Sequence, residues 1–426
     1  MVSLSHIHAT TKTQQRLTHG LLPYLRKHGL HIDSMAVRGC CTVSLRQLPT
    51  SLQLTSLQLQ CVSVQLQPGG GYEGVLRPGL PLKQLRLGIG CVLLDEDQGL
   101  AAALHGLPRL EHLTVSISSQ GVAAGVLQQL QQVTYLDLHC KSGGFRYGQT
   151  FLQPLQALTH LVDLRVGGNP NHHFTADMLS GLCSLTRLSL TDTSLDPAAL
   201  AGKTQLQHLQ LFLCNVPGGA AGIAQLLWRL QDLTKLTYLS LKRSLCDVDR
   251  GNPPAASFSA LTASSNLQHL DISWCMLPEG AWQHVFPAGG HLPRMQSLVL
   301  ENIAVLVRGS MRGGGPLIGR TTPAPDGSVV SCCPGLQSLD LQCVLCSKGL
   351  LCALPRLSKL TLLRLGFVEG VRGSEVLESM CRLTELRSLQ VVARSDCQGL
   401  ILLTQLKQLT HLRNASYVRA SICRAR

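Results

Sequence analysis

The stretch LQHLQLFLCNV, residues 206–216, decides the fold of this chain, and LQHLDISWCML, residues 267–277, repeats its pattern. Aliphatic residues occupy positions 1, 4, 6 and 11 of both stretches, and cysteine occupies position 9. Side chains of a β-strand alternate between its two faces, so positions 4 and 6 share one face. Each stretch therefore predicts a short strand with one buried face, followed by a bend.

The first six positions, L-x-x-L-x-L with other aliphatic residues in some copies, recur along most of the chain. Successive copies begin 21 to 31 residues apart, except for one step of 41 between Met295 and Leu336. The copies begin at Leu54, Leu82, Leu110, Val133, Leu161, Leu185, Leu206, Leu236, Leu267, Met295, Leu336, Leu360, Leu386 and Leu409.

This spacing and period resemble those of leucine-rich repeat proteins. The resemblance predicts an α/β fold: a solenoid, or horseshoe, with a curved parallel sheet on its concave face and mainly helical segments on its convex face. Residues 121–128, 175–185, 196–202 and 220–230 have helical spacing or capping residues, which favours helices behind the strands. Residues 91–110 are similar to the ribonuclease-inhibitor type of repeat.

Five segments follow from the repeats. Residues 1–53 are expected to form an N-terminal capping segment, and residues 415–426 a basic C-terminal tail. Repeats are expected over residues 54–305 and 336–414. Residues 306–335, rich in glycine and proline, fall within the step of 41 and are interpreted as an inserted loop.

The insertion contains GGPLIGRT, residues 314–321, which is close to the phosphate-binding loop pattern G-x-x-x-x-G-K-[ST]. Arg320 stands in place of the lysine, and Pro316 removes one of the backbone N–H groups that would hold a phosphate. Pro323 and Pro325 follow where the pattern requires a helix. The stretch therefore indicates an insertion rather than a nucleotide site.

Charge and composition narrow the classes of partner. The formal net charge is +13, but residues 1–50 and 401–426 supply +10 of it, so the central repeats lack the continuous excess of Lys and Arg that nucleic-acid binding favours. No apolar run is long enough for a membrane span, and the N-terminus lacks an export signal. We expect a cytoplasmic protein with reduced thiols that binds neither nucleic acid, membrane nor small-molecule substrate.

Catalytic, cofactor-binding and metal-binding residues are not expected. Cys346 takes an inward position and Cys343 lies on a turn, so the cysteines near residues 332–346 diverge rather than converge on a zinc ion. The 16 histidines are dispersed, and none accompanies a nucleophile in a recognisable catalytic arrangement. The expectation is a protein that is not an enzyme.

The outward strand positions are the remaining candidates for function. Asp137 with Arg165 and Asp340 with Arg364 are expected to form cross-strand ion pairs of structural value. Exposed aromatic side chains among polar groups are typical of binding hot spots. The predicted partner-binding residues are Tyr135, His208, Phe212, Tyr238, Lys242, His269, Asp271 and Trp274.

Blocks such as LLPYLRKHGLHIDS, GLAAALHGLP, LTASSNLQHLDIS and VSCCPGLQSLD are similar to those of a large, mostly uncharacterised leucine-rich repeat family of green algae. That resemblance implies a scaffold that binds a partner protein of unknown identity. Two alternatives stay open: an F-box-type substrate receptor of a ubiquitin ligase whose N-terminal box is missing or truncated, and a regulator of the Ran GTPase-activating type or a component of the ciliary axoneme.

Overall fold

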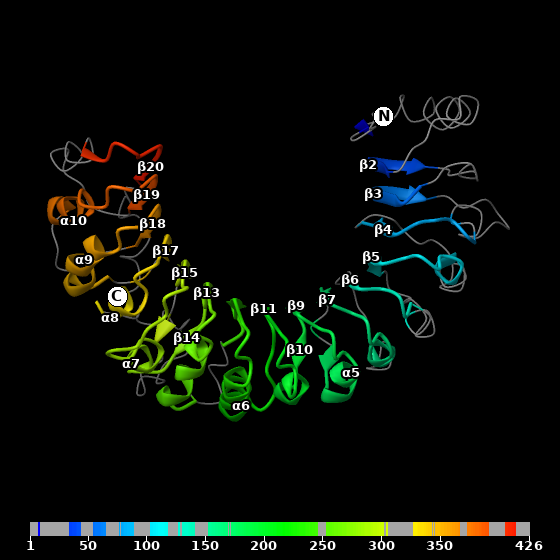
Figure 1. The fold of residues 1–426 in the computed structure, drawn as a ribbon, viewed down its shortest axis with the longest axis horizontal. Coiled ribbons are helices and arrows are strands. Elements are labelled where there is room, and N and C mark those ends of the chain that lie inside the picture. Colours follow the sequence, from blue (N-terminus) through cyan, green and yellow to red (C-terminus); the bar gives the residue numbers. More distant parts are fainter. Residues whose placement is uncertain are drawn as a thin grey trace, which may run out of the picture. The chain divides into compact units, whose positions relative to one another are not determined.

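The computed structural model describes residues 7–8, 34–43, 54–64, 76, 78–88, 103–117, 127, 130–140, 152–168, 170, 172–245, 253–301, 304–305, 327–342, 344, 346–366, 373–391 and 405–414. The chain divides into two compact units, Met1–Ala199 and Leu200–Arg426. Each unit contains parallel strands joined by return segments, as the repeated sequence pattern predicts (Figure 1).

In unit 1 the described strands form one parallel sheet in chain order. They are β1 (Ile7–His8), β2 (Ser34–Val43), β3 (Ser56–Val64), β4 (Gln84–Leu87), β5 (His112–Ile117), β6 (Tyr135–Cys140), β7 (Asp163–Gly167) and β9 (Arg187–Thr191). Strands β8 (His173–Phe174) and β10 (Ser194–Leu195) form a separate parallel pair. The return segments include η4 (Gln153–Ala157), α5 (Ala176–Ser180) and η5 (Pro197–Leu200), where η denotes a 3-10 helix. The predicted capping segment, residues 1–53, thus contains two strands of the sheet.

Unit 2 repeats this arrangement. Its main sheet contains β11 (His208–Phe212), β12 (Tyr238–Ser240), β13 (His269–Asp271), β15 (Ser297–Val299), β17 (Ser338–Leu341), β18 (Leu362–Leu365), β19 (Ser388–Val391) and β20 (His411–Asn414), again parallel and in chain order. Strands β14 (Met276–Leu277) and β16 (Ala304–Val305) form a short second pair.

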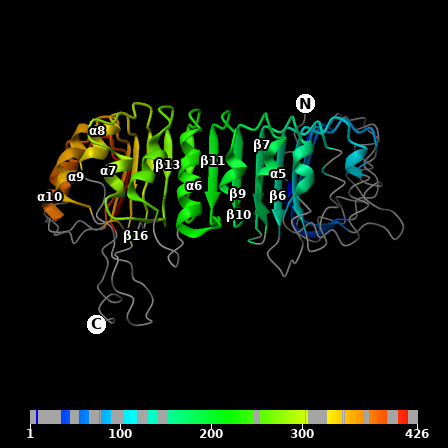
Figure 2. The same cartoon turned by 90° about the horizontal axis from the view of Figure 1, so that it is seen from below.

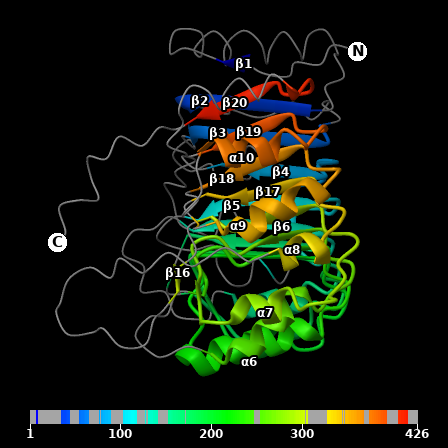
Figure 3. The same cartoon turned by 90° about the vertical axis from the view of Figure 1, so that its left-hand side faces the viewer.

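Helices cover one side of the unit 2 sheet. They are α6 (Gly219–Gln231), η6 (Ala255–Thr262), α7 (Ala281–Val285), α8 (Ser328–Cys332), α9 (Lys348–Ala353), η7 (Leu354–Arg356) and α10 (Gly373–Met380). Figure 2 views this helical side, and Figure 3 shows that α6 to α10 follow one another along the unit. The N-terminus of α9 is capped by Ser347, whose Oγ accepts a hydrogen bond from the backbone N–H of Leu350 at 3.2 Å.

The helical segments agree only in part with the sequence prediction. The prediction of a helix over residues 220–230 is confirmed by α6, and that over 175–185 by the shorter α5. Residues 196–202 instead contain the 3-10 helix η5, because only five residues separate Asp196 from Gly202, whose φ is +72°. The predicted segment 121–128 lies outside the described residues except for Leu127.

The core consists of the inward strand leucines, stacked in rows from repeat to repeat. Leu209, Leu239 and Leu270 face one another across the sheet register and are 0–1% exposed. Leu412 in β20 holds the same position but is 51% exposed, since no further described strand packs against it. Each inward leucine is therefore buried by the repeats on both sides, and no repeat has a closed core of its own.

The 41-residue interval between the repeats that start at Met295 and Leu336 is described only toward its two ends. Residues 327–335 of the predicted insertion contain α8, which packs beside α9, and Cys332 and Cys333 are buried there. The stretch GGPLIGRT lies outside the described residues. Cys346 is buried, as its inward register position predicts, whereas Cys343 is not described.

Candidate functional site

Three aromatic rings of neighbouring strands stack on the outward face of the unit 2 sheet. His208, Tyr238 and His269 are partners in the strand register, so their side chains leave the sheet side by side. The centroids of His208 and Tyr238 lie 4.0 Å apart with the planes 1° from parallel, and those of Tyr238 and His269 lie 4.3 Å apart at 7°. We call these three residues the ring stack.

The stack forms because parallel strands lie about 4.8 Å apart, which is close to the stacking distance of planar rings. Burial raises the pKa of Tyr238, and the Asp271 carboxylate adds to this effect. Burial lowers the pKa of His269, and Asp271 offsets part of that change. Both groups therefore favour their neutral forms at neutral pH.

Asp271 lies beside the stack, two residues after His269 and on the same face of β13. Its Oδ2 accepts a hydrogen bond from the Ser240 hydroxyl at 3.3 Å, and its Oδ1 accepts one from the backbone N–H of Ser273 at 2.9 Å. Lys242 lies two residues after Ser240, and its Nζ is 3.9 Å from Oε2 of Glu301. Asp271 is thus the predicted polar residue beside the stack. Lys242 is four residues beyond Tyr238, so it lies toward the strand ends, where it is loosely paired.

A second group of side chains lies where the strands end. Phe212 is the last residue of β11, four residues beyond His208, which places it about 13 Å from the stack along the strand. In the repeat that starts at Leu267, Trp274 lies one residue beyond the position that matches Phe212. The guanidinium carbon of Arg243 lies 4.5 Å from the centroid of the Trp274 ring. The structure therefore separates Phe212 and Trp274 from the ring stack.

The backbone at this level takes an uncommon conformation. Leu213, Arg243 and Trp274 hold equivalent places in three successive repeats and have φ values of 55°, 58° and 61°. For residues other than Gly, Asn and Asp this left-handed conformation costs about 1–2 kcal/mol. Leu213 is 40% exposed and Arg243 is exposed as well, so this edge presents an apolar and a cationic side chain. Sequence reasoning missed both residues, because neither type signals a left-handed conformation.

Tyr135, the remaining predicted residue, lies in unit 1 and belongs to a different cluster. Its hydroxyl donates to Oδ2 of Asp137 at 3.4 Å, its ring lies 5.5 Å from that of His112, and the Arg165 guanidinium lies 5.2 Å from its centroid. Burial is the main cause that raises the pKa of Tyr135, followed by Asp137.

One predicted ion pair is wrong and one is confirmed. Asp137 and Arg165 do face each other in the register, but Arg165 donates two hydrogen bonds to Asp163 of its own strand, at 3.1 and 3.2 Å. Asp163 competes successfully because residues two apart on a strand share a face. Asp137 pairs instead with Nε2 of His139 at 3.1 Å, which raises the pKa of His139.

The second predicted pair forms as expected. Nη1 of Arg364 donates to Oδ2 of Asp340 at 3.0 Å across strands β17 and β18. Asp340 is 6% exposed, so the ion pair supplies a charged partner for a buried carboxylate.

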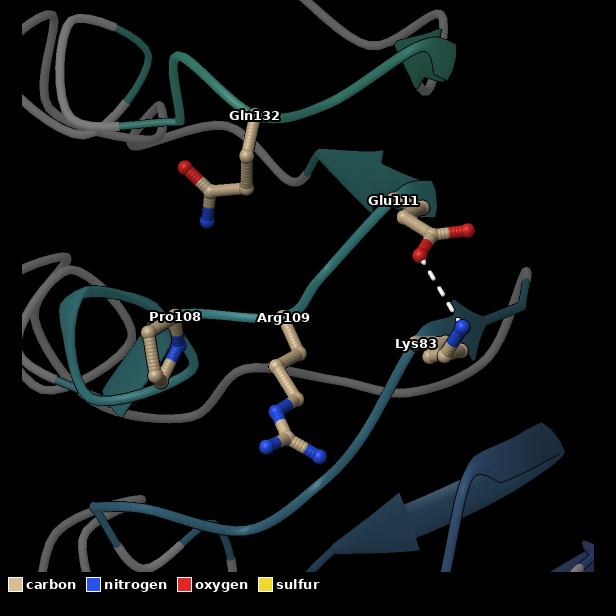
Figure 4. Close-up of a pocket in the computed structure, with 5 residues that line it drawn as sticks. All are labelled: Lys83, Pro108, Arg109, Glu111 and Gln132. Carbon is tan, nitrogen blue, oxygen red and sulfur yellow. Dashed lines mark ion pairs between the residues drawn. The ribbon is translucent and has the colours of Figure 1, made fainter.

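A surface hollow of about 360 Å³ lies in unit 1. It is lined by Lys83, Pro108, Arg109, Glu111 and Gln132 (Figure 4). Nζ of Lys83 lies 3.2 Å from Oε1 of Glu111, and both side chains are about half exposed. Exposed ion pairs of this kind contribute little to stability, and the hollow offers no enclosed apolar volume for a ligand.

The described part of the chain holds no group of three or more His, Cys, Asp or Glu side chains placed to bind a metal ion. Burial raises the pKa of Cys333 and of Cys346 to about 12, so both stay protonated thiols and are poor nucleophiles. Within the same described residues no helix has the length and apolar composition to span a bilayer.

Comparison with known proteins identifies the fold. No protein-family model matches the chain. No curated protein matches it either. An internalin of Listeria monocytogenes is similar in structure, with 14% sequence identity, a TM-score of 0.50, and coverage of 95% of this chain and 96% of that one.

Two further solved structures have lower TM-scores. A leucine-rich repeat protein of Leptospira interrogans is 15% identical, covers 92% and 98% of the two chains and has a TM-score of 0.46. The Toll–Spätzle complex of Drosophila includes a chain that is 13% identical over 93% of this chain and 49% of that one, with a TM-score of 0.49. The fold is a leucine-rich repeat solenoid, which the strand register and the stacked leucines define and the internalin likeness supports.

Proposed function

We propose that this chain is a non-enzymatic scaffold that binds a partner protein through the outward face of the unit 2 sheet. The observation that carries the proposal is the ring stack of His208, Tyr238 and His269, which is half-buried and has the Asp271 carboxylate beside it. Tyrosine, the central ring of the stack, is one of the residue types that dominate the binding energy of many interfaces.

The stack is already formed in the absence of a partner. Each ring is held by its neighbour, and Asp271 is oriented by two hydrogen bonds. Groups that are fixed in advance lose little conformational entropy on binding, so more of the contact energy appears as affinity. Phe212, Lys242 and Trp274 extend the proposed surface toward the ends of the strands, and Leu213 and Arg243 complete it there.

We further propose that the protein is cytoplasmic and belongs to the green-algal leucine-rich repeat family, with repeats of the ribonuclease-inhibitor type. The sequence blocks that resemble that family support the origin, and the thirteen-residue helix α6 behind β11 supports the repeat type. Tyr135 of unit 1 is proposed as a second contact, which is independent of the ring stack.

The test compares partner capture by the wild-type chain and two variants, using affinity purification from a green-algal extract with quantitative mass spectrometry. The first variant carries Phe212→Ala and Tyr238→Ala. The matched control is Trp228→Ala, because Trp228 is an aromatic residue of α6 that is 55% exposed on the helical side. Circular dichroism first establishes that all three proteins are folded.

We expect a protein that is captured by the wild type and the Trp228 variant but is reduced at least tenfold with the double variant. The directness of the contact is then checked with the purified partner by calorimetry. Equal capture by all three chains would refute the outward sheet face as the binding surface. Loss of capture with Trp228→Ala alone would assign binding to the helical side.

A further inference from the structure

The row of side chains that begins with the ring stack continues with two serines. The strand register places Ser297 directly beside His269, and Ser338 beside Ser297. All five positions of this row are half-buried. The stack thus stops at His269, although the sheet beneath it continues.

One face of the His269 ring lies against Tyr238, and its other face is directed toward the strand that carries Ser297. The rings of the stack are spaced by 4.0 and 4.3 Å, and the next place at that spacing is above Ser297. A seryl side chain ends at its hydroxyl and is much shorter than a ring. Ser297 is only partly buried, so a planar group can approach the place above it from the outward face.

The charge beside this place is negative. Asp271 shares a face with His269, and within the described residues its carboxylate has no cation at ion-pair distance. Two other carboxylates nearby do have a cationic partner: Asp340 is paired with Arg364, and Glu301 is paired with Lys242. Diagonal neighbours on a sheet are within reach of long side chains. A cationic group above Ser297 could therefore contact Asp271.

We propose that the partner protein inserts an arginine side chain above Ser297, with its guanidinium stacked on His269 and paired with Asp271. This inference rests on the proposed function, and it names the chemistry of the partner. Guanidinium is planar and cationic, so it satisfies both the ring face and the carboxylate. Lysine would satisfy only the charge, and a phenyl ring only the stacking. Burial lowers the pKa of His269, so its neutral imidazole does not repel the cation.

A nucleobase is the competing planar group, but the same place is disfavoured for nucleic acid. Asp271 lies beside this place, and within the described residues no cation at ion-pair distance offsets its charge, so it would repel a phosphate backbone. The experiment includes RNA for this reason.

The probes are twelve-residue peptides selected by phage display on the full-length chain, synthesised with a fluorescent label and measured by fluorescence anisotropy. A labelled single-stranded RNA of twelve nucleotides is measured in parallel. Each selected peptide is also made with Arg→Lys and Arg→Phe replacements. The peptides are tested on the wild type and on Ser297→Trp, Asp271→Asn and Tyr238→Ala variants.

The matched control is Ser388→Trp, because Ser388 holds the same row position in β19. All variants must show the wild-type circular dichroism spectrum, so that loss of binding is not loss of fold. We expect arginine-containing peptides whose affinity falls at least tenfold with Arg→Lys, with Ser297→Trp and with Asp271→Asn. Ser388→Trp should leave their affinity unchanged.

Other outcomes separate this inference from the proposed function. Peptides that lose affinity with Tyr238→Ala but lack arginine, or that tolerate Ser297→Trp, overturn the arginine site and leave the sheet face as a binding surface. Peptides that tolerate all the sheet variants, or a selection that yields none, overturn both proposals. If the RNA binds the wild type but not the Ser297→Trp variant, the place above Ser297 takes a nucleobase and the arginine site is overturned.

Discussion

At the scale of single residues, a short polar side chain at position 9 joins neighbouring repeats in two successive copies. The Cys275 thiol donates to the carbonyl oxygen of Leu241 in the preceding repeat at 3.0 Å. Ser244 holds the equivalent position one repeat earlier, and its hydroxyl donates to the carbonyl oxygen of Leu211 at 3.0 Å. Both side chains are buried. Cysteine and serine are therefore exchangeable here because each is small and carries a hydrogen-bond donor.

The first prediction concerns this position. Cys275→Ala removes the donor to a buried carbonyl and leaves a small cavity, so we expect a loss of about 1–3 kcal/mol in the free energy of unfolding. Cys275→Ser keeps a donor and should cost less than half as much. Urea denaturation followed by circular dichroism measures both. If serine proves as costly as alanine, packing of the sulfur rather than the hydrogen bond explains the cysteine.

The second prediction concerns pH. The pKa of His269 is lowered in the folded protein, so below about pH 6.5 the unfolded chain binds more protons at this residue and acid reduces stability. The pKa of His139 is raised by its bond to Asp137, so its contribution is fully present below that pH and is lost as pH rises through the folded pKa. The two histidines therefore change the pH dependence of the free energy of unfolding in opposite directions.

Urea unfolding of the wild type, His269→Asn and His139→Asn between pH 5 and 8 measures these contributions. The stability difference between the wild type and the His269 variant should be smaller at pH 5 than at pH 8. The difference for the His139 variant should be larger at pH 5. A constant difference across the range would mean that the histidine concerned does not titrate differently in the two states.

At the scale of elements, close backbone contacts within a return segment constrain individual glycines. A Cβ atom at Gly222 in α6 would overlap the backbone carbonyl of Pro217, since the chain turns sharply into the helix. A Cβ atom at Gly349 in α9 would meet only the Ser347 Oγ, at 3.8 Å. The same residue type therefore has a packing role in one helix and none in the other.

The third prediction uses this contrast. Gly349→Ala should raise the free energy of unfolding by about 0.5–1 kcal/mol, because alanine is the better helix former and meets no obstacle. Gly222→Ala should lower it by roughly 2 kcal/mol or more, because backbone atoms must move. Thermal melts of both variants decide the matter. A stabilising Gly222→Ala would show that α6 begins in a different conformation.

At the scale of the whole molecule, stability in each unit comes from contacts between successive repeats. The strand leucines are fully buried only where a repeat lies on either side, as the exposed Leu412 shows. Stability in such an array is approximately a sum of repeat terms and nearest-neighbour terms. A defect in one repeat should therefore affect its neighbours first.

The fourth prediction follows from this arrangement. Leu270→Asp places a charge at a position that is 0% exposed, so it should unfold β13 together with the adjacent β12 and β15. Hydrogen exchange with mass spectrometry should show protection lost most strongly in those strands and least in β19. Gln268→Asp, at an exposed position two residues earlier, is the control. Uniform loss of protection over unit 2 would contradict nearest-neighbour coupling.

Much of the fold could be predicted from the sequence, because it depends on local spacing. The L-x-x-L-x-L copies placed Leu209 and Leu270 inward, and Cys346 as well, without knowledge of distant contacts. The outward positions of His208, Tyr238 and His269 followed from the same alternation. The strands β1 and β2 could not be predicted in this way, because their sequences do not repeat the leucine pattern.

The candidate site was predictable only as a set of outward positions. Arg165 forms its hydrogen bonds with Asp163 rather than with Asp137. The backbone at Leu213 and Trp274 has a left-handed conformation. Both outcomes depend on competition among atoms from the same or neighbouring repeats. The sequence by itself determined the repeat, its register and which side chains face outward, because strand alternation is a local property. Only the tertiary structure decided that three rings stack, that Asp271 lacks a cation among the described residues and that Phe212 and Trp274 lie apart from the stack, because these depend on distances across strands.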